Sequence, residues 1–221
     1  IYHSEVAPVN QYLYQASIEV YDLSKEAWDR GMVVLERVSE ERLKKVGETY
    51  RQIRNTLRYQ LSNLYDFDPA VHAVSDGDLT PLDRWILGEF ALLEAEAAAA
   101  YSAHEFHLVY QKLSQFIAVQ LSALFHDVVK DRLYTDAVNS PRRRSTQTAL
   151  HRMVTRLCQI LSPILVFTAE EAWEFVPGRP TASVHLSVWS PDATAADSVL
   201  QPLLALREGA LTELEKARQA K

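Results

Sequence analysis

The feature that most constrains the fold of this chain is the spacing of apolar side chains between residues 43 and 64. They recur at intervals of three, four or seven positions, which is the period of an α-helix packed lengthwise against a neighbour. The positions are Leu43, Val46, Tyr50, Ile53, Leu57 and Leu64. The pattern predicts one long helix from about residue 39 to residue 64.

A row of cations accompanies this apolar seam. Lys44, Arg51, Arg54 and Arg58 each follow a seam residue by one position, so each lies about 100° round the helix from the seam. We expect these side chains to be exposed at the shoulder of a bundle, where a rigid row of cations can meet a row of anions. A solvated helix face without a partner is the plainer alternative.

Further helices are predicted downstream. Thr80 can cap a helix that begins with Pro81 and has Asp83 in its first turn, and this helix extends to about Tyr101. Other helices are expected over 104–130, over 140–161 after Ser140-Pro141, over 168–176 with Thr168 as the cap, and over 197–219, with a weak helical pattern over 11–30 and a polar loop over 66–79. Alternating apolar residues over 183–189 predict a short strand-like segment.

These elements predict an all-α fold, an antiparallel bundle of about four long helices with short connections, followed by the strand-like segment and a C-terminal helix. The expected organisation is an N-terminal segment of unclear role over 1–36, the bundle over 37–178, and the extended segment and C-terminal helix over 179–221.

Composition limits the class of protein. The 221 residues are 48% hydrophobic, enough for one substantial core. No apolar run approaches the roughly 18 residues that a membrane span needs, and no secretory leader pattern is present. With one cysteine, an internal disulfide and a cysteine-based zinc site are excluded. We expect a cytoplasmic protein without membrane contact, and Ile1 suggests a piece excised from a longer chain.

Charge is distributed unevenly along the chain. The net charge is −6, but residues 37–58 carry seven basic and three acidic residues, a balance of +4. Residues 130–156 carry seven basic and two acidic residues, a balance of +5, which leaves −15 for the remainder. A polyanion would be attracted to one face of such a molecule and repelled from the others.

The second basic segment contains three consecutive arginines, Arg142, Arg143 and Arg144, in the first turn of a predicted helix. Cations there oppose the helix dipole, so without local compensation they indicate an external anion. An accidental surface cluster is the alternative. Nearby, Lys130 and Arg132 end the preceding helix and Tyr134 could stack on an unpaired base, although pairing within the bundle and burial of the tyrosine remain open.

Signs of catalysis or metal binding are weak. His104 and His107 are three positions apart and could share a helical face, but no further ligand follows nearby. No paired carboxylates, nucleophile–histidine–acid order or glycine-rich phosphate loop stands out. We therefore predict neither catalytic nor metal-binding residues in this chain.

Several ordered motifs resemble one known family. They are the segments 50–58 (YRQIRNTLR), 82–86 (LDRWI), 130–135 (KDRLYT), 143–149 (RRSTQTA), 162–173 (SPILVFTAEEAW) and 183–189 (SVHLSVW). In this order they resemble the anticodon-binding helical domain of bacterial-type isoleucyl-tRNA synthetase. The second motif is shared with valyl and leucyl relatives, whereas the first and third favour the isoleucyl branch.

The resemblance implies a module that docks the anticodon arm of isoleucine tRNA during aminoacylation. The family's catalytic signatures, His-x-Gly-His and Lys-Met-Ser-Lys-Ser, do not occur, so the chain should be inactive alone. The catalytic domain of a longer parent is an implied partner, and ATP with magnesium, and zinc, are implied only for that parent. The implied RNA-binding residues are Lys44, Arg51, Arg54, Asn55, Arg58, Lys130, Arg132, Tyr134, Arg142, Arg143 and Arg144.

We expect the cations to neutralise phosphates and Asn55 and Tyr134 to contact bases. Three alternatives stay open. The first is the equivalent domain of a valyl- or leucyl-type relative. The second is a helical protein-interaction module without RNA binding, and the third is an enzyme fragment with residual catalysis through the two histidines.

Overall fold

A computed structural model describes residues 40–191 and 198–219, with side chains from Lys44 onward. The chain divides into two compact units, Ile1–Tyr50 and Arg51–Lys221. The predicted helix over 11–30, the capping role of Ser39 and the predicted segment 1–36 lie outside the described residues. The predicted domain boundaries after residues 36 and 178 stay predictions.

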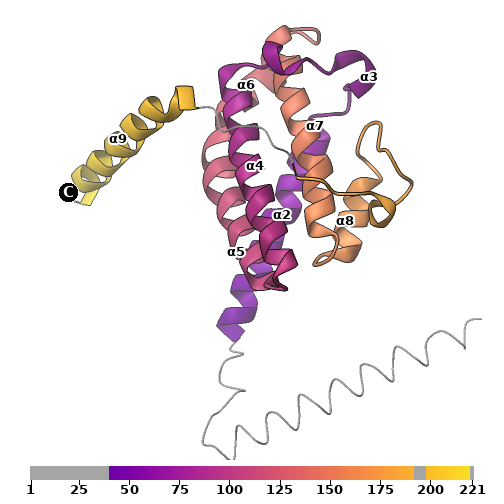
Figure 1. Cartoon of the computed structure of the whole chain (residues 1–221). Helices are drawn as coiled ribbons and strands as arrows, with labels where there is room; N and C mark the ends of the chain where they lie inside the picture. Colours follow the sequence, from indigo (N-terminus) through magenta and orange to yellow (C-terminus); the bar gives the residue numbers. More distant parts are fainter. Residues whose placement is uncertain (1–39, 192–197, 220–221) are drawn as a thin grey trace, which may run out of the picture. The chain divides into compact units, whose positions relative to one another are not determined.

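The described residues are helical, as the sequence predicts (Figure 1). The long elements are α2 (Glu40–Ser62), α4 (Pro81–Ser102), α5 (Phe106–Phe116), the π-helix η3 (Ile117–Phe125), α6 (His126–Thr135), α7 (Pro141–Leu161) and α9 (Gln201–Gln219). The shorter ones are α3 (Pro69–His72), α8 (Val166–Trp173) and the 3-10 turns η2 (Asp76–Asp78), η4 (Val184–Leu186) and η5 (Ser198–Leu200). The all-α prediction is confirmed.

The helix start at Thr80 forms as predicted. The Thr80 side chain accepts a hydrogen bond from the backbone N–H of Asp83, and Pro81 occupies the first turn, where its missing N–H costs nothing. Short connections after α4 and α6 reverse the chain, so that α4, α5 and α7 lie side by side (Figure 1). This is the predicted antiparallel arrangement.

Three local predictions differ from the structure. The helix expected over 104–130 begins only at Phe106, because His104 adopts a left-handed backbone conformation (φ 59°) between α4 and α5. Helix α8 begins two residues before Thr168, which is therefore not its cap. The polar loop over 66–79 contains α3 and η2.

The predicted strand-like segment over 183–189 is wrong. Its centre is the 3-10 turn η4, and no strand occurs among the described residues for it to pair with. Val184 is buried, whereas Leu186 and Val188 are exposed, so the alternation does not mark one buried face. An alternating pattern needs a neighbouring strand before it becomes a sheet.

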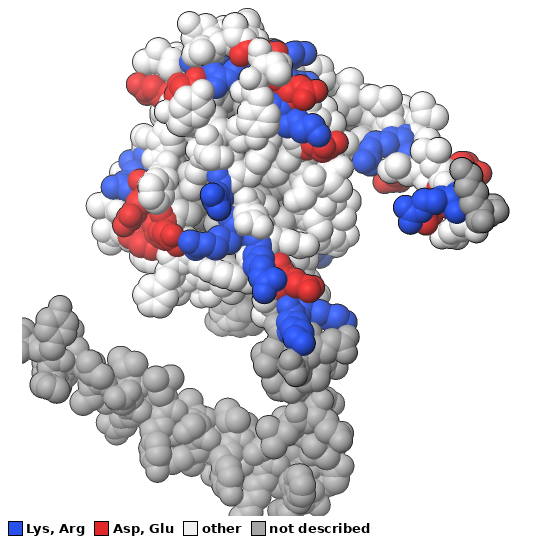
Figure 2. Space-filling model, turned by 180° about the vertical axis from the view of Figure 1, so that it is seen from behind, with Lys and Arg blue, Asp and Glu red and all other residues white. Residues whose placement is uncertain are grey.

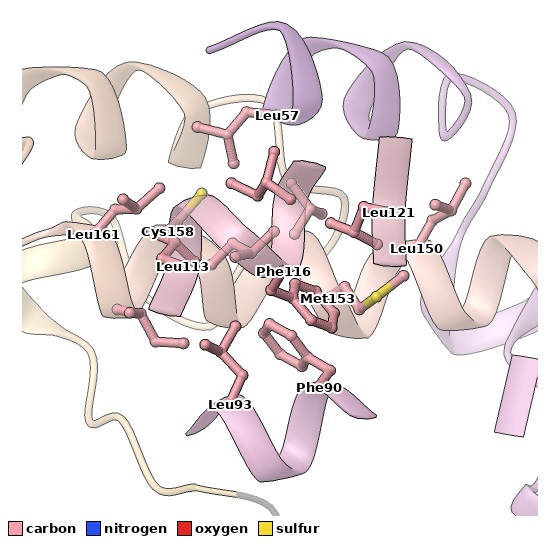
Figure 3. Close-up of a cluster of buried hydrophobic side chains, with 14 of the residues drawn as sticks. Leu57, Phe90, Leu93, Leu113, Phe116, Leu121, Leu150, Met153, Cys158 and Leu161 are labelled. Atoms are coloured by element: carbon pink, nitrogen blue, oxygen red, sulfur yellow. The ribbon is translucent and has the colours of Figure 1, made fainter. Parts of the chain in front are cut away.

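The core forms where α2, α4, α5, η3 and α7 converge (Figure 3). The labelled side chains Leu57, Phe90, Leu113, Leu121 and Met153 come from these five elements in turn and are all buried. The predicted seam of α2 is buried at Ile53, Leu57 and Leu64, but Val46 and Tyr50 are exposed.

The single cysteine belongs to this core. Cys158 on α7 is fully buried among apolar side chains (Figure 3). Burial disfavours the thiolate and raises the pKa of the thiol to about 12. In the described part of the chain, no helix is both long and apolar enough to cross a bilayer.

A polar cluster fixes the start of α4 against α7. The buried carboxylate of Asp83 accepts hydrogen bonds from Thr80 (2.6 Å), Ser145 (2.6 Å) and Thr146 (3.1 Å). Arg132 lies 3.5 Å from the same carboxylate. Desolvation raises the pKa of Asp83, while these donors and the cation favour its charged form. Five polar side chains thus hold α4, α6 and α7 together at one end of the bundle.

His126, at the start of α6, packs against α2. Its ring lies 4.3 Å from the ring of Tyr59, centroid to centroid, and its Nε2 lies 3.4 Å from the Gln60 amide nitrogen. Burial lowers the pKa of His126 to about 4, since the charged form loses its hydration. The folded chain therefore holds this imidazole neutral at pH values where an unfolded histidine is charged.

We predict that His126 makes stability depend on pH between about 4 and 6.5. In this window the unfolded state binds a proton that the folded state does not, so the free energy of unfolding falls as pH falls. From pH 7 to pH 5 the loss is about 2 kcal/mol, because the pKa of His126 is about 4 in the folded chain and near 6.5 in the unfolded one. Urea unfolding at both pH values measures it.

The variant His126→Gln is the control, because it lacks the titrating group but keeps the other ionisable residues. Its free energy of unfolding should fall by about 2 kcal/mol less than that of the unmodified chain over the same pH change. An equal loss in the two proteins would contradict the assignment to His126.

Candidate nucleic-acid interface

The second half of α2 has one buried and one exposed face. Ile53, Thr56, Leu57 and Gln60 point into the bundle and are buried. Arg51, Arg54, Asn55 and Arg58 are exposed, and their spacing of three and four places them on one face of the helix. In the view from behind, Lys and Arg side chains gather along the middle of the described surface, with acidic side chains beside them (Figure 2).

The three arginines of this face differ in their partners. Arg54 forms a bidentate pair with Glu171 on α8, with nitrogen–oxygen distances of 2.7 and 2.8 Å. The hydrogen bonds from Arg54 lower the pKa of the Glu171 carboxyl. Within the described ranges, neither Arg51 nor Arg58 has an ion-pair partner. Arg51 and Arg58 are thus free to meet an external anion.

An open groove adjoins this face. Its volume is about 670 Å³, and it lies between the C-terminal half of α2, the turn that follows, and α8. Its lining includes Arg54, Leu57, Arg58, Leu61, Ser62, Leu64, Tyr65, Phe67, Thr168, Glu171, Ala172, Phe175 and Pro177. The groove therefore combines two arginines and a carboxylate with an aromatic and apolar lining.

The arginine triplet at the start of α7 is not a surface cluster. Arg143 and Arg144 are only 3% and 6% exposed. Arg143 donates two hydrogen bonds to the Asp66 carboxylate, at 2.6 and 3.0 Å, and Arg144 donates to the Asp66 carbonyl and to Gln147. The expectation that these cations lack local compensation is wrong, because an acid 77 positions earlier in the chain supplies it.

Asp66 responds to this pairing. Partial burial alone would raise the pKa of its carboxyl, but hydrogen bonds from Arg143 and Gln147 outweigh that effect and lower the pKa. The hydrogen bond that the Asp66 carboxylate accepts from the Gln147 side-chain amide measures 2.8 Å between nitrogen and oxygen. The turn after α2 is thereby joined to the first two turns of α7, which positions the C-terminal end of α2.

The other predicted residues are divided between pairing and exposure. Arg142 is exposed and pairs with Asp136, and Lys130 is exposed and pairs with Asp127. Arg132 is half-buried in the Asp83 cluster, where it also donates to Thr80. Tyr134 is exposed, and Asn55 is exposed with no side-chain hydrogen bond to a described residue. Lys44 is exposed and belongs to the first unit.

The basic balance of residues 130–156 is thus largely neutralised within the fold. Arg152 pairs with Asp76 and Arg156 with Glu94, in addition to the pairs already described. All these acids except Asp127 and Asp136 come from residues 66–94. Most cations of the second basic segment are therefore paired with acids from elsewhere in the chain.

Two residues of the groove were missed by sequence reasoning. Tyr65 and Phe175 follow the ends of α2 and α8, where a helical period no longer assigns a side chain to a face. The only feature of the sequence that could have indicated them is that each is an aromatic residue just beyond the end of a helix.

The two histidines weighed as metal ligands, His104 and His107, are not part of a larger ligand cluster among the described residues. No group of three or more His, Cys, Asp or Glu side chains lies together there as a metal site would require. His104 and His107 are both exposed, and the left-handed turn at His104 separates it from α5. The i, i+3 relation that motivated a shared ligand face is absent.

Comparison with known families agrees with this geometry. Residues 83–221 match the family described as the anticodon-binding domain of tRNA ligase. The chain belongs to this family.

The individual relatives are isoleucine–tRNA ligases. The protein of Nitrosococcus oceani is 44% identical over 155 residues, covering 70% of this chain and 16% of the relative. That of Desulfitobacterium hafniense is 42% identical over 190 residues (83% and 21%), and that of Legionella pneumophila is 41% identical over 186 residues (82% and 20%). The chain spans about one fifth of the length of these curated relatives.

The described contacts predict a large loss of stability on replacing one arginine and almost none on replacing another. Arg143→Ala should destabilise the chain by about 3–5 kcal/mol, because it leaves the partly buried Asp66 carboxylate without its bidentate partner. Arg58→Ala should change the free energy of unfolding by less than about 0.5 kcal/mol, as expected for an exposed side chain without an ion pair. Urea unfolding of both variants measures the difference, and equal effects would contradict it.

Proposed function

We propose that this chain binds the anticodon arm of isoleucine tRNA through the exposed face of α2, as one module of an isoleucine–tRNA ligase. The supporting observation is a pair of exposed cations, Arg51 and Arg58, that have no ion-pair partner among the described residues and lie on a helix beside a groove. Membership of the anticodon-binding family and the names of the relatives support tRNA as the partner and isoleucine as the specificity.

The proposal separates two kinds of contact. Arg51 and Arg58 are seven positions apart, about two helical turns or 10 Å along α2, so they can neutralise separate phosphates. Asn55 lies between them and offers both a donor and an acceptor to a base edge. Lys130, Tyr134 and Arg142 remain candidates at the surface.

The buried Arg143 and Arg144 and the half-buried Arg132 act through the fold in this proposal. Arg143 and Arg144 hold the turn after α2, and Arg132 holds the start of α4. They position the binding face and are not proposed to touch RNA.

Only the similarity to isoleucine–tRNA ligases connects this chain with the activities of a whole ligase. Isoleucine activation, with ATP and magnesium, and zinc binding stay predictions for a longer parent and are assigned to no residue of this chain. The missing catalytic domain is the proposed intramolecular partner, and the cytoplasm, where tRNA is charged, is the proposed location.

We predict that the double variant Arg51→Glu/Arg58→Glu weakens binding of an isoleucine tRNA transcript by more than tenfold. Two lost phosphate contacts should also reduce the slope of log K against log salt by roughly 1.5. Filter binding at several salt concentrations measures both quantities.

A matched control carries the same change in net charge elsewhere. Lys112→Glu/Arg218→Glu reverses two exposed cations on α5 and α9. It should retain the salt slope and most of the affinity. If both double variants lose affinity equally, general charge repulsion explains the loss and the α2 face is not the binding site.

We also predict that Glu171→Gln strengthens tRNA binding by roughly two- to fivefold. The Glu171 carboxylate competes with RNA phosphate for Arg54, and an exposed ion pair of this kind is worth a few tenths to 1 kcal/mol. Combining Glu171→Gln with Arg54→Ala should abolish the gain. Unchanged or weaker binding by Glu171→Gln would show that Arg54 does not exchange partners.

A further inference from the structure

The groove beside α2 exposes two aromatic rings, although the hydroxyl of one of them, Tyr65, also interacts with Arg143. Tyr65 is 81% exposed and Phe175 is 67% exposed, and both line the groove. Neither ring contacts another ring among the described residues. Exposed aromatic faces beside arginines are the arrangement on which unpaired bases stack in single-stranded RNA.

The size of the groove limits what it can hold. Its volume of about 670 Å³ falls within the range of pockets that bind small organic molecules. An A-form duplex is too wide to enter a groove of this volume. Proteins contact such a duplex from outside, along its grooves and backbone. One unpaired nucleotide fits the volume, whereas the stem does not.

The charges of the groove indicate where the base and the phosphate of a bound nucleotide would each lie. Arg54 and Glu171 neutralise one another across the groove lining, so their part of the wall has little attraction for an anion. Arg58 lines the same groove and has no ion-pair partner among the described residues. A nucleotide is therefore held best with its base against the aromatic and apolar lining and its phosphate at Arg58.

We propose that this groove binds one unpaired nucleotide of an RNA loop, with the base stacked on Tyr65 or Phe175 and the phosphate paired with Arg58. The proposal rests on the tRNA-binding function and adds a defined site to it. The Arg54–Glu171 pair forms the polar part of the wall.

The test compares two RNA probes, the anticodon stem-loop of isoleucine tRNA and a blunt duplex made from its stem. At least one of the variants Tyr65→Ala and Phe175→Ala should weaken binding of the stem-loop by roughly tenfold, the typical loss for one base–aromatic stack. Binding of the duplex should be unchanged. Tyr65→Phe keeps the ring and should restore stem-loop affinity, which separates stacking from loss of the hydroxyl.

Phe167→Ala is the matched control, because Phe167 is an exposed aromatic residue on α8 that does not line the groove. It should leave stem-loop binding unchanged. A second readout uses 2-aminopurine at successive loop positions. One position should change its fluorescence on binding, and this change should be lost in Tyr65→Ala or Phe175→Ala.

The outcomes show separately whether the groove site is wrong and whether the RNA-binding function on which it rests is wrong. If Arg51→Glu/Arg58→Glu loses tRNA binding but both alanine variants bind the stem-loop normally, the α2 face binds RNA and the groove does not hold a nucleotide. If all variants bind RNA equally, the function itself is wrong and the groove suits another partner. Equal losses for stem-loop and duplex would also overturn the groove site.

Discussion

The rest of the structure depends on the pairing of buried arginines with carboxylates at one end of the bundle. Arg143 meets Asp66, and Arg132 meets the fully buried Asp83. Each carboxylate also accepts hydrogen bonds from α7, at Gln147 or at Ser145 and Thr146. Such pairs tolerate little displacement, because a partner removed from a buried charge leaves it uncompensated. They fix where α2 ends and where α4 begins, and thus the position of the groove.

This pairing explains how an acidic chain can present a basic face. The acids of residues 66–94 pair with most of the cations of α6 and α7, so those cations are at least partly neutralised within the chain. Among the described residues, Arg51 and Arg58 have no ion-pair partner. The exposed face of α2 can therefore attract a polyanion although the chain as a whole is acidic.

Much of the fold could be predicted because its signals are local. Helix α4 begins at a cap and a proline, and the buried half of α2 follows its apolar period at Ile53, Leu57 and Leu64. The predicted strand failed because alternation over 183–189 had no neighbouring strand to join. The break at His104 depends on a left-handed turn that His104 adopts without a glycine to signal it.

The candidate site could be predicted only in part, for a different reason. Exposure of Arg51 and Arg58 follows from the helical period alone. Whether Arg143 faces solvent depends on Asp66, which lies far away in the chain and reaches it only through folding. The same holds for Tyr65 and Phe175, which share a groove only because α2 and α8 come together.

The buried thiol of Cys158 has a practical consequence for experiments on this chain. Its pKa of about 12 and its full burial leave almost no accessible thiolate at neutral pH, so alkylating dyes should not modify it in the folded state. A cysteine introduced on the surface would then be the one reactive thiol of these 221 residues when folded. The chain can therefore carry a site-specific fluorophore or spin label without replacement of Cys158.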